Sequence, residues 1–168
     1  MVGRVSRGNA VVVRPLNWVV RAHMGAVLRN ATEEDAEFAV LTERETMQAY
    51  ALATWGDWQA TEMRQRAVDN VLAGRTQIIE NNGVPIGLLR VERAAECINL
   101  KQIFIRPRYQ RQGLGAELLH QLIDEARNKG VPLRLRVLRV NPAQRLYKRL
   151  GFTVVRETPE HVYMEYAL

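Results

Sequence analysis

The segment from residue 103 to residue 129 constrains this chain more than any other. Residues 103–105 are an apolar run typical of a buried strand, and a turn that contains Gly113 and Gly115 follows. The turn opens into a helical pattern whose apolar positions share one face: Leu118, Leu119, Leu122, Ile123 and Ala126. A strand that passes through a glycine turn directly into an amphipathic helix predicts a fold that mixes strands and helices.

The same turn is suited to binding phosphate. Successive backbone amides of a turn and the first amides of a helix bind anionic oxygens, and the helix dipole favours negative charge there. Gly113 and Gly115 keep side chains away from the backbone. The nearby cationic side chains of Arg106, Arg108 and Arg111 add favourable charge. The turn therefore indicates a site for a diphosphate.

Two common nucleotide-binding motifs also combine glycines with a helix N-terminus, and neither fits this turn. A dinucleotide-binding fingerprint needs a third glycine where this chain has Leu118, and a P-loop needs Gly-Lys-Ser or Gly-Lys-Thr, which the sequence lacks. A purely structural role for Gly113 and Gly115 stays open on the turn alone.

The rest of the sequence alternates between strand and helix patterns. We expect strands at residues 26–29, 76–80, 86–93, 97–105, 133–138, 152–156 and 162–167. We expect helices at residues 32–49, from 57 or 61 to about 72, at 115–129 and at 142–150. The order β-α-α-β-β-β-α-β-α-β-β predicts one mixed α/β (α+β) domain over residues 25–168.

Composition narrows the function classes. An apolar fraction of 47% and a charged fraction of 25% are ordinary for a globular protein. The single cysteine, Cys97, excludes an intramolecular disulfide and a cysteine-based zinc cluster, and its place in an apolar run indicates a strand residue. We expect no metal site and a cytoplasmic location.

Residues 1–24 form an N-terminal extension with a basic charge. The net charge is +6, but this extension carries four arginines and no acidic residue, which leaves 20 basic and 18 acidic residues elsewhere. Its apolar runs are far shorter than the roughly 20 residues of a membrane span. Two interpretations are open: a disordered tail, or sequence upstream of a natural start at Met24, which we favour. An edge strand at residues 10–13 is a further alternative.

Two motifs in this order resemble the GCN5-related N-acetyltransferase (GNAT) superfamily. The segment Gln110-Arg111-Gln112-Gly113-Leu114-Gly115 matches the family's acetyl-CoA signature, Gln/Arg-x-x-Gly-x-Gly/Ala. The second motif is an Asn before a short helix that contains a Tyr and ends in Gly-Phe, and its counterparts here are Asn141, Tyr147, Gly151 and Phe152. The resemblance covers residues 26–167.

The resemblance implies a mostly antiparallel central sheet, flanked by helices, whose fourth and fifth strands diverge around acetyl-CoA. The backbone of Ile103, Phe104 and Ile105 would bind the pantetheine arm. The amides of Arg111 to Gly115, with Gln110 and Gln112 in the motif, would hold the pyrophosphate, and Asn141 and Ala143 would border the coenzyme.

The resemblance also implies direct attack of an amine on the thioester. Tyr147 would point at the sulfur and act as general acid, although packing against the sheet is the alternative role for this side chain. Some members of the family carry a glutamate on the fourth strand that acts as general base, and Asn99 occupies this region here. Because Asn99 cannot act as a base, we name Glu96, three residues earlier, as the candidate base. Glu92 and a reaction without a dedicated base stay open.

The connection between the first two helices is the expected acceptor site. Tyr50, Trp55, Asp57 and Trp58 could hold a cationic amine by cation–π and ionic contacts, or the two tryptophans could cover the core. His161 and Tyr163 are further candidates. We expect a small primary amine as acceptor, with a protein N-terminus or lysine as the alternative.

A non-catalytic acyl-CoA-binding or regulatory domain is the competing function. We expect no nucleic-acid or membrane partner, and the family favours a homodimer.

Overall fold

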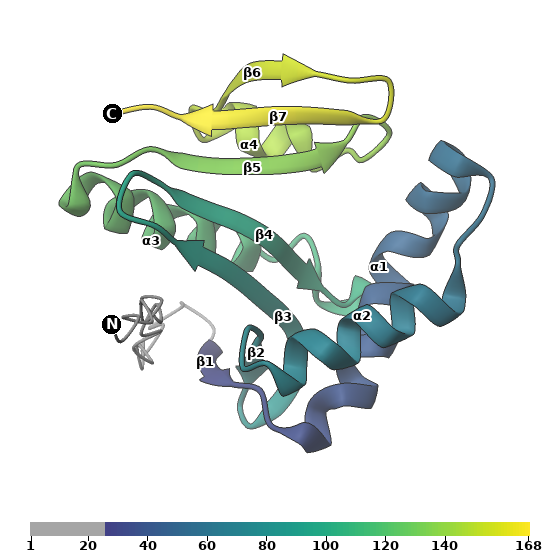
Figure 1. Cartoon of the computed structure of the whole chain (residues 1–168). Helices are drawn as coiled ribbons and strands as arrows, with labels where there is room; N and C mark the ends of the chain where they lie inside the picture. The colour runs from purple at the N-terminus through teal and green to yellow at the C-terminus, as the bar shows by residue number, and fades with distance from the viewer. Residues whose placement is uncertain (1–25) are drawn as a thin grey trace, which may run out of the picture.

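A computed structural model describes residues 26–168 and contains one seven-stranded sheet (Figure 1). The strands are β1 Ala26–Asn30, β2 Gln77–Asn81, β3 Val84–Arg93, β4 Ile98–Ile105, β5 Leu133–Leu138, β6 Thr153–Glu157 and β7 His161–Tyr166. Their order in the sheet is β1-β2-β3-β4-β5-β7-β6. The pair β4–β5 is parallel and all the other pairs are antiparallel.

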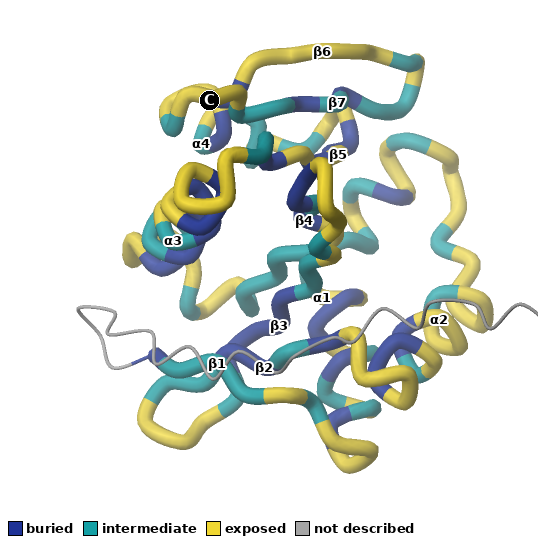
Figure 2. The backbone as a smooth tube through the Cα atoms, turned by 60° about the vertical axis from the view of Figure 1, so that its left-hand side comes forward, coloured by how far each residue is buried: buried dark blue, intermediate teal, exposed yellow. Residues whose placement is uncertain are grey.

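Helices cover both faces of the sheet. They are α1 Ala36–Trp55, α2 Ala60–Leu72, α3 Leu114–Lys129 and α4 Gln144–Arg149, with short 3₁₀ turns η1 Glu33–Asp35 and η2 Pro107–Tyr109. The α3 and α4 helices pack on one face, where the main core includes Leu119, Leu133 and Met164. The first helical pair covers the other face, where Ala39 and Val71 pack on Leu88. Figure 2 shows the buried side of α3 and the exposed edge strand β6.

One extra residue in β4 separates the two halves of the sheet. Strands β4 and β5 are paired only from Ile98 to Leu100. Next to this point, Arg90 of β3 pairs with Gln102 while Val91 pairs with Leu100, so Lys101 is the additional residue of a β-bulge. A bulge bends its strand and increases the local twist. From Lys101 onward, therefore, β4 diverges from β5 and leaves one strand edge without a ladder partner (Figure 1).

The pairing of β3 with β4 depends on a glycine. A Cβ atom at Gly87 would lie 2.3 Å from the carbonyl oxygen of Phe104. No side chain fits at that distance without movement of the backbone, so Gly87 permits the close approach of these strands. Gly87 thereby permits β3 to pair with the divergent half of β4, where it lies opposite Ile105.

The predicted fold class, the element order and the divergence of the fourth and fifth strands are confirmed. The first helix is longer than predicted and ends at Trp55, because no helix-breaking residue precedes Gly56, which has φ +74°. Cys97 lies one residue before β4 and is buried. The predictions for residues 1–24, including the edge strand at 10–13, lie outside the described residues. No helix within residues 26–168 is both long and apolar enough to cross a bilayer.

Candidate active site

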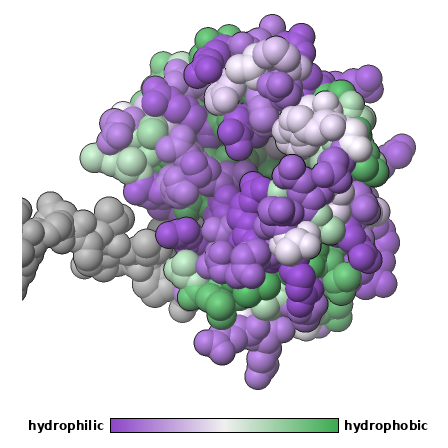
Figure 3. All heavy atoms as spheres, turned by 45° about the vertical axis from the view of Figure 1, so that its right-hand side comes forward, coloured by the Kyte–Doolittle hydropathy of each residue, from purple (hydrophilic) through white to green (hydrophobic). Residues whose placement is uncertain are grey.

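A cleft of about 1250 Å³ lies where β4 and β5 diverge. Its walls come from the helices α1, α2, α3 and α4 and from the strands β3, β4, β5, β6 and β7. In the space-filling view the molecular surface is mostly hydrophilic, with apolar side chains gathered in patches (Figure 3). Such a volume exceeds the 300–1,000 Å³ of most small-molecule sites and suits a long ligand together with a second one.

At one end of the cleft, the backbone of the glycine turn has the form of an anion site. Arg111 and Gly113 both have left-handed backbone conformations, with φ +63° and +88°. Positive φ at a non-glycine residue such as Arg111 is strained and is concentrated at functional sites. Gly113 is the N-cap of α3 and no side chain caps this helix. The first amides of α3, from Leu114 and Gly115 onward, therefore lack intrahelical acceptors and favour an anion.

Side chains around the turn fix its shape. The side-chain amide of Gln110 donates a hydrogen bond to the carbonyl oxygen of Ile105 across 2.7 Å, which ties the turn to the end of β4. Arg106 forms an ion pair with Glu45 of α1. Of the three arginines expected to screen phosphate, only Arg111 lines the cleft, because Arg106 is paired and Arg108 stacks on Tyr109.

The second motif begins α4. The side-chain oxygen of Asn141 accepts a hydrogen bond from the amide of Ala143 at 2.9 Å. The side-chain amide of Gln144 donates to the carbonyl oxygen of Arg139 at 2.8 Å and so anchors the helix to the end of β5. Asn141 and Ala143 both line the cleft. This short helix positions one aromatic side chain, that of Tyr147.

Tyr147 lines the cleft but is only 7% exposed. Its ring packs edge-on against Phe152, with centroids 5.9 Å apart. Burial raises the pKa of Tyr147 to about 12, so the phenol stays protonated throughout the neutral range. The structure thus shows that Tyr147 packs on the core and borders the cleft, and its role as general acid stays a prediction.

The four predicted acceptor residues, Tyr50, Trp55, Asp57 and Trp58, all line the cleft on the side of α1 and α2. Trp55 is 54% exposed, which rules out the alternative that it covers the core. Its ring lies 6.0 Å from that of His161, so the end of α1 meets the start of β7 across the cleft. Asp57 accepts hydrogen bonds from the amides of Trp58 and Gln59 and shapes the loop.

The prediction of Glu96 as general base is not supported by the structure. Glu96 is exposed in the turn between β3 and β4 and is not among the residues that line the cleft. The alternative, Glu92, is ion-paired with Lys101 and does not line the cleft either. Glu92 lies near the end of β3 and Glu96 in the turn before β4, whereas β4 diverges from β5 only from Lys101 onward.

A carboxylate that sequence analysis missed does line the cleft. Glu43 of α1 is 7% exposed, and burial raises its pKa, partly opposed by a hydrogen bond from Gln102 and by the charges of Arg90 and Arg66. Its signal in the sequence is its spacing of four residues from both Ala39 and Met47, on the buried side of the helix. Sequence analysis also missed Arg90, whose signal is a charged residue within a mostly apolar strand.

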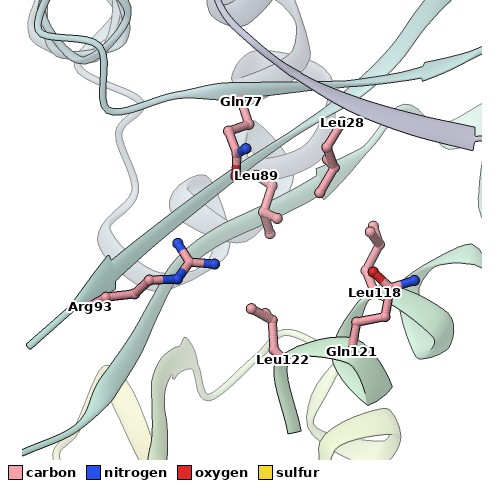
Figure 4. Close-up of a pocket in the computed structure, with 7 residues that line it drawn as sticks. All are labelled: Leu28, Gln77, Leu89, Arg93, Leu118, Gln121 and Leu122. Atoms are coloured by element: carbon pink, nitrogen blue, oxygen red, sulfur yellow. The ribbon is translucent and has the colours of Figure 1, made fainter. Parts of the chain in front are cut away.

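A second pocket is too small for a ligand. It lies between the sheet and α3 and has room for about 10 Å³, no more than one water molecule. Figure 4 shows Leu28, Leu89 and Arg93 of the sheet facing Leu118 and Leu122 of α3. The groups of His, Cys, Asp and Glu that a metal requires are not found within residues 26–168.

Two curated proteins match parts of this chain. The [ribosomal protein bS18]-alanine N-acetyltransferase of Haemophilus influenzae is 39% identical over 80 residues, or 47% of this chain and 54% of the relative. The L-methionine sulfoximine/L-methionine sulfone acetyltransferase of Salmonella typhimurium is 38% identical over 60 residues, or 34% of this chain and 35% of the relative. The matches thus span about half and one third of these relatives.

Solved structures share the fold. The PaiA N-acetyltransferase from Thermoplasma acidophilum, solved in complex with coenzyme A, aligns with a TM-score of 0.72 at 19% identity, over 86% of this chain and all of that one. A model of the Acetyltransferase (GNAT) family matches residues 30–152, which include both motifs and most of the cleft. With the diverging strands and the glycine turn in the places described above, the chain belongs to the GNAT acetyltransferase family.

Proposed function

We propose that this enzyme is an N-acetyltransferase that transfers the acetyl group of acetyl-CoA to a small primary amine. The observation that carries the proposal is the continuous cleft, which joins an uncapped helix N-terminus to a chamber with a buried carboxylate. An anionic donor and an amine acceptor can thus meet where β4 leaves β5. Both matched relatives are named as acetyltransferases, one of them as an N-acetyltransferase, which supports this class of reaction.

The donor fits the side of the cleft formed by α3 and α4. The amides from Arg111 to Gly115 would hold its diphosphate. The unpaired edge of β4, at Ile103, Phe104 and Ile105, would bind the amide groups of its pantetheine arm. Gln110 would maintain the turn, and Gln112 and Leu114 contribute backbone to it. Acetyl-CoA would supply an activated carbonyl and a thiolate leaving group.

The acceptor fits the side formed by α1 and α2. A new bond from the amine nitrogen to the acetyl carbon forms while the carbon–sulfur bond breaks, and the amine loses one proton. Glu43 takes the role for which Glu96 was predicted: its raised pKa suits a carboxylate that accepts this proton. Amides of the β4 edge would stabilise negative charge on the carbonyl oxygen.

Tyr147 would assist the departure of the sulfur. A free thiol has a pKa of roughly 8.5, well below the value of about 12 for Tyr147. Complete loss of the tyrosine proton is therefore uphill. The hydroxyl acts best by donating a hydrogen bond to the sulfur as negative charge develops on it. The proton that the amine loses is the one that finally protonates the thiolate, which leaves coenzyme A as a free thiol.

A protein N-terminus is the second candidate acceptor, and the relative that acetylates an alanine of a ribosomal protein favours it. The relative that acetylates methionine sulfoximine and sulfone favours a small amine. Trp55 and His161 are in contact across the acceptor side, which narrows the entry for a polypeptide and suits a small molecule better.

Calorimetric titration with acetyl-CoA, with NADH and ATP as controls, is the first test. Selective binding of acetyl-CoA would support the assignment of the turn. Thiol release is then measured with a panel of small amines and with peptides that carry free N-termini. Turnover confined to the peptides would overturn the small-amine proposal, and binding without any turnover would favour the non-catalytic alternative.

A further inference from the structure

The acceptor side of the cleft has arginines without acidic partners. Lys101 and Arg134 line the cleft, but they pair with Glu92 and Glu165 at 3.1 and 2.7 Å. Apart from Arg111 and Arg149 on the donor side, three arginines line it that have no carboxylate within 4.0 Å among residues 26–168: Arg66, Arg90 and Arg136. An amine-binding chamber with this charge is unexpected, since a cationic amine alone would be repelled.

Arg90 is the most constrained of the three. It lies in the middle of β3, and its Nε atom is inaccessible to solvent and has no hydrogen-bond partner in the described part of the chain. A buried donor without a partner costs free energy. Burial also lowers the pKa of Arg90, which means that its cationic form is incompletely compensated. A bound anion would compensate this charge and accept hydrogen bonds from the terminal guanidinium nitrogens, which are not buried in the way that Nε is.

Arg90 and Glu43 are close but separate. Each lowers the cost of charging the other, yet they form no ion pair within 4.0 Å. Glu43 is instead held by Gln102, and the only hydrogen bond of Arg66 within residues 26–168 is to the sulfur of Met63. Opposite charges held apart in this way suit a ligand that carries both an ammonium and a carboxylate group.

We propose that the acceptor is a small amine that carries a carboxylate, as an α-amino acid does, with Arg90 binding the carboxylate and Glu43 facing the amine. Arg66, exposed on α2, adds favourable charge at the entrance. The inference rests on the proposed function and specifies the substrate of the same site. An amine that lacks a carboxylate would provide no anionic partner for Arg90.

The test compares amino acids with amines that lack only the carboxylate. L-Leucine is paired with isopentylamine and with L-leucinamide, and L-phenylalanine with phenethylamine, at equal concentrations of the neutral amine. Thiol release gives kcat/KM. We expect each amino acid to exceed its partners roughly 10- to 100-fold, as charge-assisted hydrogen bonds predict.

Variants assign the preference to the arginines. Arg90→Met should lower the ratio of kcat/KM for leucine to kcat/KM for isopentylamine roughly 10- to 100-fold, because any effect of the Arg90 charge on Glu43 acts on both substrates. Arg90→Lys should restore part of the loss. Arg64→Met is the matched control, because Arg64 lies on α2 and pairs with Glu37 away from the cleft. Unchanged acetyl-CoA affinity by calorimetry would show that each variant is folded. Arg66→Met, at an exposed site, is expected to give a smaller, salt-sensitive loss.

The outcomes separate the two proposals. Equal turnover of amino acids and amines would overturn the carboxylate subsite while the small-amine function stands. A loss in Arg90→Met that is the same for leucine and isopentylamine would also overturn it. Turnover of none of the small amines, with acetyl-CoA still bound, would overturn both.

Discussion

Gln102, on the divergent half of β4, donates a hydrogen bond from its side-chain amide to Glu43 of α1 across 3.2 Å. This contact connects the strand expected to bind the donor with the helix expected to bind the acceptor. It also holds a buried carboxylate in one orientation within the cleft. The relationship of these two residues leads directly to a prediction for catalysis.

Replacement of Glu43 by glutamine removes the proposed base and keeps the side-chain shape. We expect kcat/KM to fall roughly 100-fold or more, as for the loss of a general base. In the unmodified enzyme, kcat/KM corrected for the neutral fraction of the amine should rise with pH through the pKa of Glu43, which burial raises above its usual range. This acidic limb should be absent in Glu43→Gln. Glu62→Gln, an exposed change on α2, is the control, and a limb retained in Glu43→Gln would contradict the assignment.

Replacement of Tyr147 by phenylalanine removes one hydroxyl and keeps the packing against Phe152. We expect kcat to fall roughly 10- to 100-fold, because the developing thiolate loses a hydrogen-bond donor. The affinity for acetyl-CoA, measured by calorimetry, should not change. Since the pKa of Tyr147 is about 12, no loss of activity from its ionisation is expected below about pH 10. An unchanged kcat would leave this residue with a packing role only.

Gly113 and Gly130 allow the effect of strain to be separated from the effect on binding. They flank α3, both have positive φ, and neither would bring a Cβ atom within 4 Å of a neighbour. Gly113→Glu and Gly130→Glu should each destabilise the fold by about 1–2 kcal/mol. Only Gly113→Glu should abolish binding of acetyl-CoA, because it places a carboxylate at the anion site. Equal affinities of the two variants would mean that the turn does not bind the diphosphate.

Asp35 should stabilise the fold in a manner that depends on pH. It accepts hydrogen bonds from Arg29 at 2.7 and 2.8 Å and from the amide of Thr32, and the first of these partners contributes most to lowering its pKa to about 2. A lowered pKa stabilises the folded state above the ordinary value of 3.8, and this contribution is lost as pH falls towards 2.

Asp35→Asn is therefore expected to lower the free energy of unfolding at pH 7 by about 2 kcal/mol. Urea denaturation between about pH 7 and pH 2 should show that the difference from the unmodified protein shrinks below about pH 4. Asp124→Asn serves for comparison, because Asp124 is exposed on α3 and lies 3.8 Å from Arg127. A difference that is constant over this pH range would show that the ion pair is not the cause.

The element order could be predicted from the sequence because local signals are strong along this chain. The strand at residues 133–138 matches β5 at both ends, and Gly130 ends α3 as expected. The end of α1 could not be predicted from apolar spacing, since its last turns face the cleft and include the exposed Trp55. A helix that borders a ligand site need not continue the apolar face that identifies it in a sequence.

The donor side of the site is easier to predict than the acceptor side. The glycine turn is one continuous segment, so the sequence from Gln110 to Gly115 indicates it directly. The acceptor chamber combines Glu43, Arg90 and Gln102, which are far apart in the sequence and meet only through packing of α1 on the sheet. Counting back from Gln110 points to Asn99, which does line the cleft, and Glu96, the carboxylate three residues earlier, lies in the turn before β4 and does not.

The bulge has a consequence for how this enzyme can change during evolution. Because one added residue in β4 opens the cleft, the width of the donor site depends on the register of β3 and β4, which Gly87 maintains. The acceptor chamber depends on α1, α2 and their connection instead. Substitutions in the helical pair can therefore exchange one amine for another without disturbing the donor, whereas a deletion at Lys101 would remove the opening that every acceptor shares.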